Sequence, residues 1–255
     1  MRIGTVDIPS RLALAPMAGV TDAAFRQICS ELGAGYTVTE LISSKALCYH
    51  DKKTLTLLRQ FPGEHPAAVQ IFGSDPVCMA EAAQIVLEHT QADIIDINMG
   101  CPMGKIVNNG DGAALMKDPD KAGRIVEAMV KAVPVPVTAK FRRGWDMGSC
   151  NCVEFAKTLE AAGVSAVAVH GRTRAQVYGG RLDLHPPGEG GGVYSRHRQR
   201  GHLEAGGRRP DFTAHQGRHG HDRQGVFRQS LALPPGPGRA GRTARAAPAA
   251  PRGAV

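Results

Sequence analysis

Six short apolar runs of the sequence each end, on the C-terminal side, in groups that can bind a ligand or react. These groups are Pro16, Met17 and Ala18, then Glu40, Gln70, Asn98 with the nearby Cys101, Lys140 and His170. A thiol, an ammonium, an imidazole, a carboxylate and two amides are suited to acid–base chemistry and to binding polar ligands. A free thiol has a pKa of about 8.5, so Cys101 is mostly protonated at neutral pH and can donate a proton. Any one of these groups could be a capping or solubilising residue, but six repeats favour a site.

The apolar runs alternate with helical stretches, which is typical of a parallel α/β fold. We predict strands over 12–15, 36–40, 67–71, 94–97, 135–140 and 166–170. Helices are expected over 21–32, with Thr21 or Asp22 as the cap, and over 76–89, 118–132 and 152–162.

The spacing suits a (β/α)8 TIM barrel, although a doubly wound open sheet has the same periodicity. The position of the polar groups favours the barrel, because a barrel builds its active site from the carboxyl ends of its strands. We therefore interpret residues 1–180 as a barrel domain in which about six strand units are recognisable.

The net charge lies entirely in the last part of the 255-residue chain. Residues 1–180 hold 18 Lys and Arg against 18 Asp and Glu, whereas 181–255 hold 13 Arg against 5 acids and carry the net charge of +8. This second segment has no Lys, Ile, Met, Asn, Cys or Trp, and its few apolar residues have no regular spacing. We predict that 181–255 is a low-complexity basic tail that is mostly disordered.

Two origins of the tail are compatible with its composition. It is either a natural Arg/Gly-rich segment or the out-of-frame translation of a GC-rich gene. The joint absence of residues with A/T-rich codons beside abundant Gly, Arg, Pro and Ala favours the frameshift.

The sequence also bears on compartment and on metals. No signal peptide is expected, because Pro16 stops the first apolar stretch, and no apolar run is long enough to span a membrane. All six cysteines precede the tail and show no paired zinc spacing, so reduced thiols in a cytoplasmic protein are the natural interpretation. Cys150 and Cys152 have no second pair, and we expect them to be loop thiols without a metal.

Six segments of residues 1–180 resemble the tRNA-dihydrouridine synthases, in particular the bacterial B-type branch. The segments are PMAGVTD (16–22), VQIFG (69–73), NMGCP (98–102), KIVNNG (105–110), AKFRRGW (139–145) and VHGRT (169–173). The resemblance implies an FMN-dependent barrel that reduces uridine in tRNA to 5,6-dihydrouridine with NADPH as the electron donor. The match covers about 1–180 and is collinear.

The resemblance also implies roles for individual residues. Cys101 would be the acid that protonates C5 of the uracil. The flavin would be bound by Pro16, Met17, Ala18, Gln70, Lys140 and His170. The tRNA would be bound by Asn98 and by cations in loops after strands, namely Lys105, Arg142, Arg143, Arg172 and Arg174. Without the resemblance, Lys140 would be read as a salt-bridged barrel lysine, His170 as a core histidine and the arginines as a solvated rim.

The sequence departs from the family after about residue 181. Flavin phosphate in such barrels is held by the loops after strands 7 and 8, which have no recognisable counterpart here. We also expect no counterpart of the family's helical C-terminal domain in residues 181–255. We therefore expect impaired flavin binding and activity in this chain.

Two other functions remain open. Another FMN barrel of the dihydroorotate dehydrogenase type also places a cysteine after a similar strand end, although the segments at 16–22 and 105–110 argue against it. The chain could also be an inactive remnant that retains RNA through its rim and basic tail.

Overall fold

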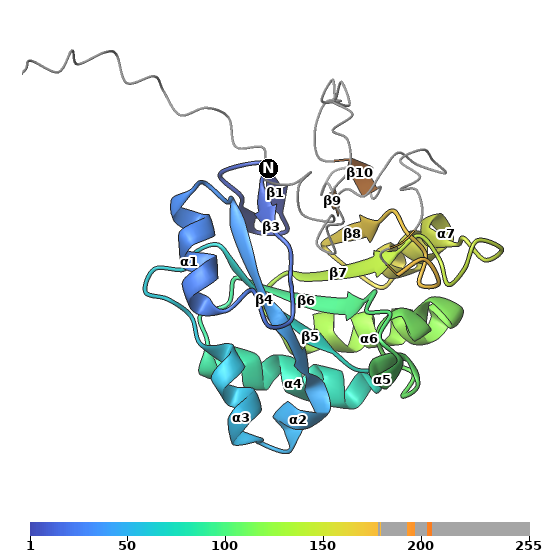
Figure 1. The fold of residues 1–255 in the computed structure, drawn as a ribbon, viewed down its shortest axis with the longest axis horizontal. Coiled ribbons are helices and arrows are strands. Elements are labelled where there is room, and N and C mark those ends of the chain that lie inside the picture. Colours follow the sequence, from blue (N-terminus) through green and yellow to red (C-terminus); the bar gives the residue numbers. More distant parts are fainter. Residues whose placement is uncertain (178, 180–192, 197–202, 206–255) are drawn as a thin grey trace, which may run out of the picture.

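Six parallel strands form the centre of the fold. The computed structural model describes residues 1–177, 179, 193–196 and 203–205. The strands are β3 (Ala13–Leu14), β4 (Tyr36–Ser43), β5 (Ala67–Phe72), β6 (Ile94–Met99), β7 (Val137–Arg142) and β8 (Ala166–His170). Each pairs in parallel with the next strand of this series along the chain. The sheet curls into a half barrel (Figure 1), which confirms the prediction of a partial (β/α)8 barrel.

Helices connect these strands, and aspartates cap three of the four longest. The α-helices are α1 (Ala23–Glu31), α2 (Ser44–Cys48), α3 (Lys52–Leu55), α4 (Pro76–His89), α5 (Gly104–Val107), α6 (Pro119–Ala132) and α7 (Cys152–Ala161), and the 3-10 helices are η1 (Thr56–Leu58) and η2 (Gly112–Lys117). Asp22, Asp75 and Asp118 each accept a backbone N–H of the first turn. Proline follows the cap in both α4 and α6. It is tolerated there because an N–H at the first helical position would have no acceptor within the helix. Among the described residues, no helix combines the length and apolarity needed to cross a membrane.

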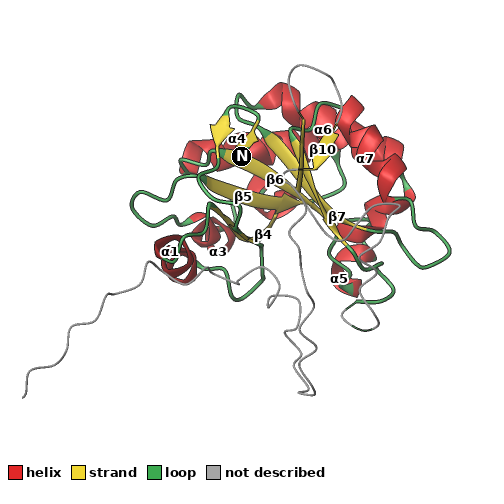
Figure 2. Cartoon of the chain, turned by 90° about the horizontal axis from the view of Figure 1, so that it is seen from above, coloured by secondary structure: helices red, strands yellow, loops and turns green. Residues whose placement is uncertain are grey.

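The two faces of the sheet bury different sets of side chains. The outer face packs against α4, α6 and α7 (Figure 2), and Phe141 of β7 meets Phe155 of α7 with ring centroids 4.9 Å apart. The inner face is apolar at the amino ends of the strands. There, the short hairpin of β1 (Arg2–Ile3) and β2 (Val6–Asp7) adds Ile3 to a cluster with Ile8, Val38, Ala68, Ile94 and Ala166. The carboxyl ends of the inner face are left for polar groups.

Strand β4 is longer than the predicted 36–40 segment because its apolar run continues through Leu41 and Ile42. Its pairing with β5 shifts register between Val38 and Leu41. A bulge of this kind bends a strand and redirects the side chains beside it. Here it lies next to Glu40, whose carboxylate accepts the backbone N–H of Gly19 and so ties β4 to the loop after β3.

Two short strands lie within the segment predicted to be mostly disordered. β9 (Val193–Arg196) pairs antiparallel with β8, and β10 (Leu203–Ala205) pairs antiparallel with β9. Both stretches extend the sheet at the open edge of β8, which offers unpaired backbone groups to a neighbouring segment. β9 runs antiparallel, so it is not a seventh strand of a (β/α)8 barrel. The other tail residues covered by the prediction lie outside the described residues.

A buried ion pair fixes α1 against the segment that leads into β5. Arg26 Nε lies 2.6 Å from Glu64 Oε1, and both side chains are only 2% exposed. The Arg26 guanidinium also donates to the carbonyl oxygens of Thr21 and Arg59, at 2.8 and 2.7 Å. Thr37 Oγ1 donates to Glu64 at 2.7 Å, which joins the pair to β4. Each charge therefore has several partners, as a buried charge requires.

We expect Arg26→Ala to lower the free energy of unfolding by about 3 to 5 kcal/mol, because it leaves the Glu64 carboxylate buried and unpaired. The matched control is Lys131→Ala, which removes an exposed partner of Glu127 on α6 and is expected to change stability little. Urea denaturation of both variants measures the difference. Similar losses in the two variants would contradict the structural weight given to the Arg26–Glu64 pair.

Candidate functional site

The inner face of the half barrel becomes polar toward the carboxyl ends of its strands. In β6, Ile95, Ile97 and Met99 belong to the core under the helices, so Asp96 and Asn98 face the other side. The same alternation in β7 puts Thr138, Lys140 and Arg142 on the inner face. Register aligns Asp96 with Gln70 and Thr138, Asn98 with Lys140, and Arg142 with His170. The strand pairing therefore gathers the predicted groups in one place.

A continuous series of hydrogen bonds crosses this face and ends at Cys101. Thr138 Oγ1 donates to Asp96 Oδ1 at 2.5 Å, and Gln70 Nε2 donates to Asp96 Oδ2 at 2.6 Å. Asn98 Nδ2 donates to Gln70 Oε1 at 2.8 Å. Asn98 Oδ1 in turn accepts the backbone N–H of Gly100 and of Cys101, at 3.1 and 2.9 Å. We call Thr138, Asp96, Gln70 and Asn98 the inner network.

Cys101 lies in the loop after β6 and is partly buried. Its backbone carbonyl accepts the N–H of Ala113 at 3.0 Å, so both sides of the residue are held. Gly112 has a φ of +58°, and a Cβ there would come 2.9 Å from the Cys101 carbonyl oxygen, so this close approach requires glycine. Burial raises the pKa of the Cys101 thiol, against smaller opposing effects of the Met103 N–H and of Arg142. The thiol is therefore protonated at neutral pH.

Lys140 is the cation of this face that has no hydrogen bond within the described part of the chain. Burial lowers the pKa of its ammonium, and Arg142 lowers it further, whereas Asp96 acts in the opposite direction. Without the family resemblance, the sequence suggested that Lys140 forms a salt bridge. No salt bridge of Lys140 is found among the described residues. Its side chain lies on the inner face, two residues before the carboxyl end of β7.

His170 ends β8 as a neutral imidazole. Its Nδ1 accepts the backbone N–H of Arg172 at 3.1 Å, so the ring proton is on Nε2. Burial lowers the pKa of His170 to about 3, with further lowering by Lys140, Arg142 and Arg172. Nε2–H is thus a hydrogen-bond donor without a charge.

The loop after β3 holds the first group of predicted flavin contacts. Thr21 Oγ1 bonds both the N–H and the carbonyl of Met17, at 3.1 and 3.2 Å, which closes the turn that contains Pro16, Met17 and Ala18. Pro16 and Met17 are partly buried and Ala18 is exposed. The turn therefore presents backbone groups and apolar side chains at the carboxyl end of β3.

Two predicted residues lie deeper than the sequence suggested. Gln70 is fully buried and both ends of its amide are engaged, so a flavin contact would have to use the remaining amide hydrogen or lone pair. Arg142 was expected in a loop but is the last residue of β7 and is 5% exposed. Its guanidinium donates to the carbonyls of Gly100, Thr173 and Val177, at 2.7, 3.0 and 3.1 Å. These bonds join the Cys101 loop to the loop after β8.

The other predicted cations lie in the loops after β6, β7 and β8. Lys105 is exposed on α5, and the backbone N–H of Arg143 donates to His170 O at 3.0 Å. Arg174 lies over the Trp145 ring, 4.5 Å from its centroid. Arg172 buries Nε and Nη1 without a hydrogen-bond partner among the described residues. Buried N–H groups without an acceptor are costly, so Arg172 is suited to bind an anion.

Sequence reasoning missed Asp96 and Thr138, which support the predicted residues from below. Asp96 is 7% exposed, and burial raises its pKa against the hydrogen bonds from Gln70 and Thr138 and the charge of Lys140. The signal was present in the sequence. Within the predicted strand 94–97, a period of two places Asp96 on the same face as Asn98.

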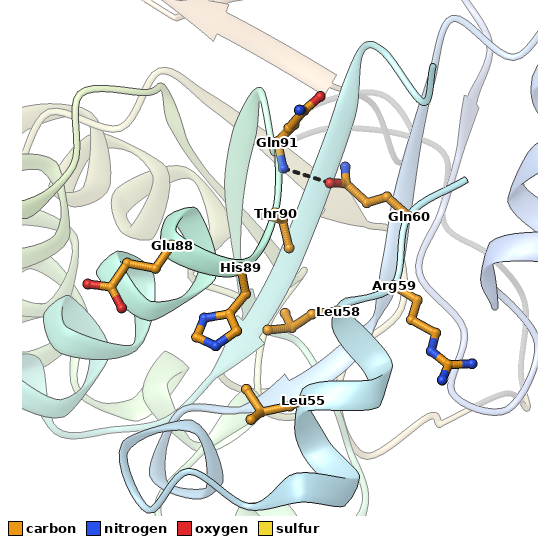
Figure 3. A pocket seen from close by; sticks show the side chains of 8 residues that line it. All are labelled: Leu55, Leu58, Arg59, Gln60, Glu88, His89, Thr90 and Gln91. Atoms are coloured by element: carbon orange, nitrogen blue, oxygen red, sulfur yellow. Dashed lines mark hydrogen bonds between the residues drawn. The ribbon is translucent and has the colours of Figure 1, made fainter. Parts of the chain in front are cut away.

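A surface pocket of about 500 Å³ lies elsewhere (Figure 3). It forms between the C-terminal end of α4 and the α3–η1 segment, where Gln60 Oε1 accepts the Gln91 N–H at 2.7 Å. Its lining consists of Leu55, Leu58, Arg59, Gln60, Glu88, His89, Thr90 and Gln91, none of them a predicted site residue. Because α4 runs back from the carboxyl end of β5 to the amino end of β6, this pocket does not belong to the strand-end site. Among the described residues, no cluster of three or more His, Cys, Asp or Glu side chains could hold a metal.

The part of the chain that forms this site matches a known protein family. The family model described as Dihydrouridine synthase (Dus) matches residues 13–185, which include all six parallel strands. The chain belongs to the dihydrouridine synthase family. The synthase match ends four residues beyond the predicted boundary at about 181 and covers every predicted site residue.

Three curated relatives of this synthase-family chain come from bacteria. It is 49% identical over 183 residues to tRNA-dihydrouridine synthase B of Pseudomonas aeruginosa, covering 72% of this chain and 55% of that protein. It is 47% identical over 178 residues to a probable tRNA-dihydrouridine synthase of Rhizobium leguminosarum bv. phaseoli, covering 70% and 56%. With tRNA-dihydrouridine synthase B of Salmonella typhimurium, identity is 46% over 185 residues, covering 72% and 57%. The B-type resemblance is confirmed, and the chain spans just over half the length of these relatives.

We expect His170 to stay neutral in the folded protein down to acid pH. Its folded pKa of about 3 lies below the ordinary value of 6.5, so between these values only the unfolded chain binds the proton. The stability from neutral His170 is present above pH 6.5 and is lost as the pH falls toward 3. NMR titration of the ring protons should show no His170 transition near neutrality, whereas His65, whose pKa the hydrogen bond to Asp93 raises, should titrate above its ordinary value. A His170 transition near pH 6.5 would contradict the burial of its ring.

Proposed function

We propose that this chain binds FMN and catalyses the NADPH-dependent reduction of uridine in tRNA to 5,6-dihydrouridine. The observation that carries the proposal is a protonated thiol, Cys101, whose loop is held by the inner network, with Lys140 and His170 near the carboxyl ends of the next two strands, in a chain of the dihydrouridine synthase family. Since the chain spans only part of its relatives, the activity, the cofactors and the substrate are all inferred. A reaction on tRNA also implies a cytoplasmic location, with which six free cysteines agree.

The donor groups fit the ring of FMN. Such a ring accepts hydrogen bonds at N1, O2 and O4, donates one from N3–H, and is stabilised by positive charge near N1 when reduced. Lys140 supplies a cation without a hydrogen bond in the described part of the chain, and His170 supplies a neutral Nε2–H donor. The turn at Pro16, Met17 and Ala18 would give backbone contacts. Bound FMN would supply the hydride that is added to C6 of the uracil.

Cys101 would supply the proton that is added to C5. The C5=C6 bond takes up one hydride and one proton, so the thiol leaves the step as a thiolate and regains its proton from solvent. Burial favours the protonated thiol before the reaction, and Arg142 and the Met103 N–H favour the thiolate after it. Both forms of the acid thus have a source of stabilisation.

The cations around the site would hold the RNA. A uridine in a folded tRNA must leave its stack to reach a buried acid, so the surrounding surface has to bind the flanking phosphates. Arg172 is the best candidate, because Nε and Nη1 have no described partner. Lys105, Arg143 and Arg174 would contribute charge from the adjoining loops, and Asn98 would bind the base. The guanidinium of Arg142 makes loop contacts that suit a positioning role better than phosphate binding.

We expect Cys101→Ala to slow dihydrouridine formation in unmodified tRNA by about 10²- to 10⁴-fold, the usual contribution of a positioned acid. Cys150→Ala, the same change at a partly buried cysteine in the loop before α7, should leave the rate unchanged. The assay follows NADPH oxidation that depends on tRNA, with dihydrouridine measured in the product. Full activity of Cys101→Ala would contradict the assignment of the acid.

The same assay separates the two alternative functions. Turnover of orotate or dihydroorotate in place of tRNA would favour a dehydrogenase, which family membership already argues against. Binding of tRNA without any flavin-dependent turnover would favour an RNA-binding remnant.

A further inference from the structure

We propose that Asp96 is a positioning residue that sets the direction of the hydrogen bonds reaching Cys101. The inference deepens the proposed function, because it says what holds the inferred acid in place. It stands on the geometry of the inner network and needs no flavin or RNA to be tested. Asp96 itself lies below the site on β6 and is 7% exposed.

The direction of the network follows from the donors that surround Asp96. Both oxygens of Asp96 accept, Oδ1 from the Thr138 hydroxyl and Oδ2 from Gln70, so Gln70 turns its NH2 group toward Asp96 and its carbonyl away. That carbonyl then accepts from the NH2 group of Asn98. The carbonyl of Asn98 is consequently directed at the loop, where it accepts two backbone N–H groups. One buried carboxylate thus orients two side-chain amides in turn.

The reverse direction is excluded by the last step of the network. If Gln70 were flipped, its NH2 group would face the NH2 group of Asn98, and Asn98 would have to flip as well. The NH2 group of Asn98 would then face the N–H groups of Gly100 and Cys101, which are donors too. The loop would lose both bonds at once. Asp96 at one end and the two loop N–H groups at the other thus require the same orientation of the network, which links Asp96 to the Cys101 loop without a contact between the two residues.

The groups around Asp96 support this arrangement. Thr138 Oγ1 donates a hydrogen bond to the second carboxylate oxygen at 2.5 Å, so both oxygens of Asp96 have a partner. Lys140 on the next inner position of β7 and the ring of Tyr36 on β4 are the other titratable groups that interact with it. The Thr138 hydroxyl can accept a hydrogen bond as well as donate one. For this reason the network can tolerate asparagine at position 96. In Asp96→Asn, the amide oxygen can serve Gln70 while the NH2 group donates to Thr138 Oγ1.

The test is the rate at which iodoacetamide alkylates Cys101 in the full-length chain, measured for each cysteine by mass spectrometry across a range of pH. Asp96→Ala should raise the Cys101 rate by about fivefold, the factor expected for one lost hydrogen bond, and should lower the pH midpoint because the thiol becomes less buried. Asp96→Asn should retain the wild-type rate. Cys29, buried in α1, serves as the internal reference for general loosening and should not change.

A matched control sits at the other end of the same strand. Asp93 directly precedes β6, and its carboxylate accepts the N–H of Ala67 at 2.8 Å and bonds His65 at 2.9 Å. Asp93→Ala removes the same chemical group without touching the inner network. It should leave the Cys101 rate unchanged even if it lowers the free energy of unfolding.

A second variant keeps the proposal testable if Asp96→Ala does not fold. Asp96→Asn with Thr138→Val preserves volume but leaves the NH2 group of residue 96 with no acceptor except Gln70. The double variant should raise the alkylation rate of Cys101 by a larger factor than the product of the factors measured for the two single variants. Substitutions at independent sites would give only that product. A product of independent effects, a parallel rise at Cys29, or the same rise in Asp93→Ala would overturn the proposal. None of these results depends on whether Cys101 acts on uridine, so failure of the proposed function remains a separate outcome.

Discussion

The alternation of side chains along parallel strands is the constraint on which the site depends. Each strand of the half barrel gives its odd or even positions to the core under the helices and the others to the inner face. The helices cover the outer face, so polar groups can gather only inside. The apolar cluster around Ile3 fills the amino ends of that inner face and leaves the carboxyl ends to Gln70, Asn98, Lys140 and His170.

Burial then gives these groups properties that they lack in water. It raises the pKa of the Cys101 thiol and of Asp96, and it lowers the pKa of Lys140 and His170. The charged groups repel or attract each other at short range, so each shift also reflects its neighbours. The result is a protonated thiol, a neutral imidazole donor and a lysine without a described hydrogen bond, at the carboxyl ends of three neighbouring strands. Acid catalysis beside a bound ring needs such a combination.

Much of this arrangement could be predicted from the sequence, because strand ends are visible as short apolar runs. The six predicted strands exist, and the polar group after each run lies at the same end of the sheet. Arg142 was misplaced because its role depends on carbonyls of two distant loops, which no local pattern reveals. Asp96 was not predicted because its role depends on hydrogen bonds from Gln70 and Thr138. Those two residues lie on the neighbouring strands and are distant in the sequence. Strand β9 depends on the free edge of β8 and has no periodicity of its own.

The central claim is that the carboxyl ends of the strands form a flavin site. The most direct measurement is a titration of the full-length chain with FMN, followed by visible absorption, in the wild type, in Lys140→Met and in Lys157→Met. Lys157 is exposed on α7 and carries the same substitution away from the site. We predict saturable binding that Lys140→Met weakens and Lys157→Met leaves intact. No saturable binding, or equal binding by both variants, would contradict the account.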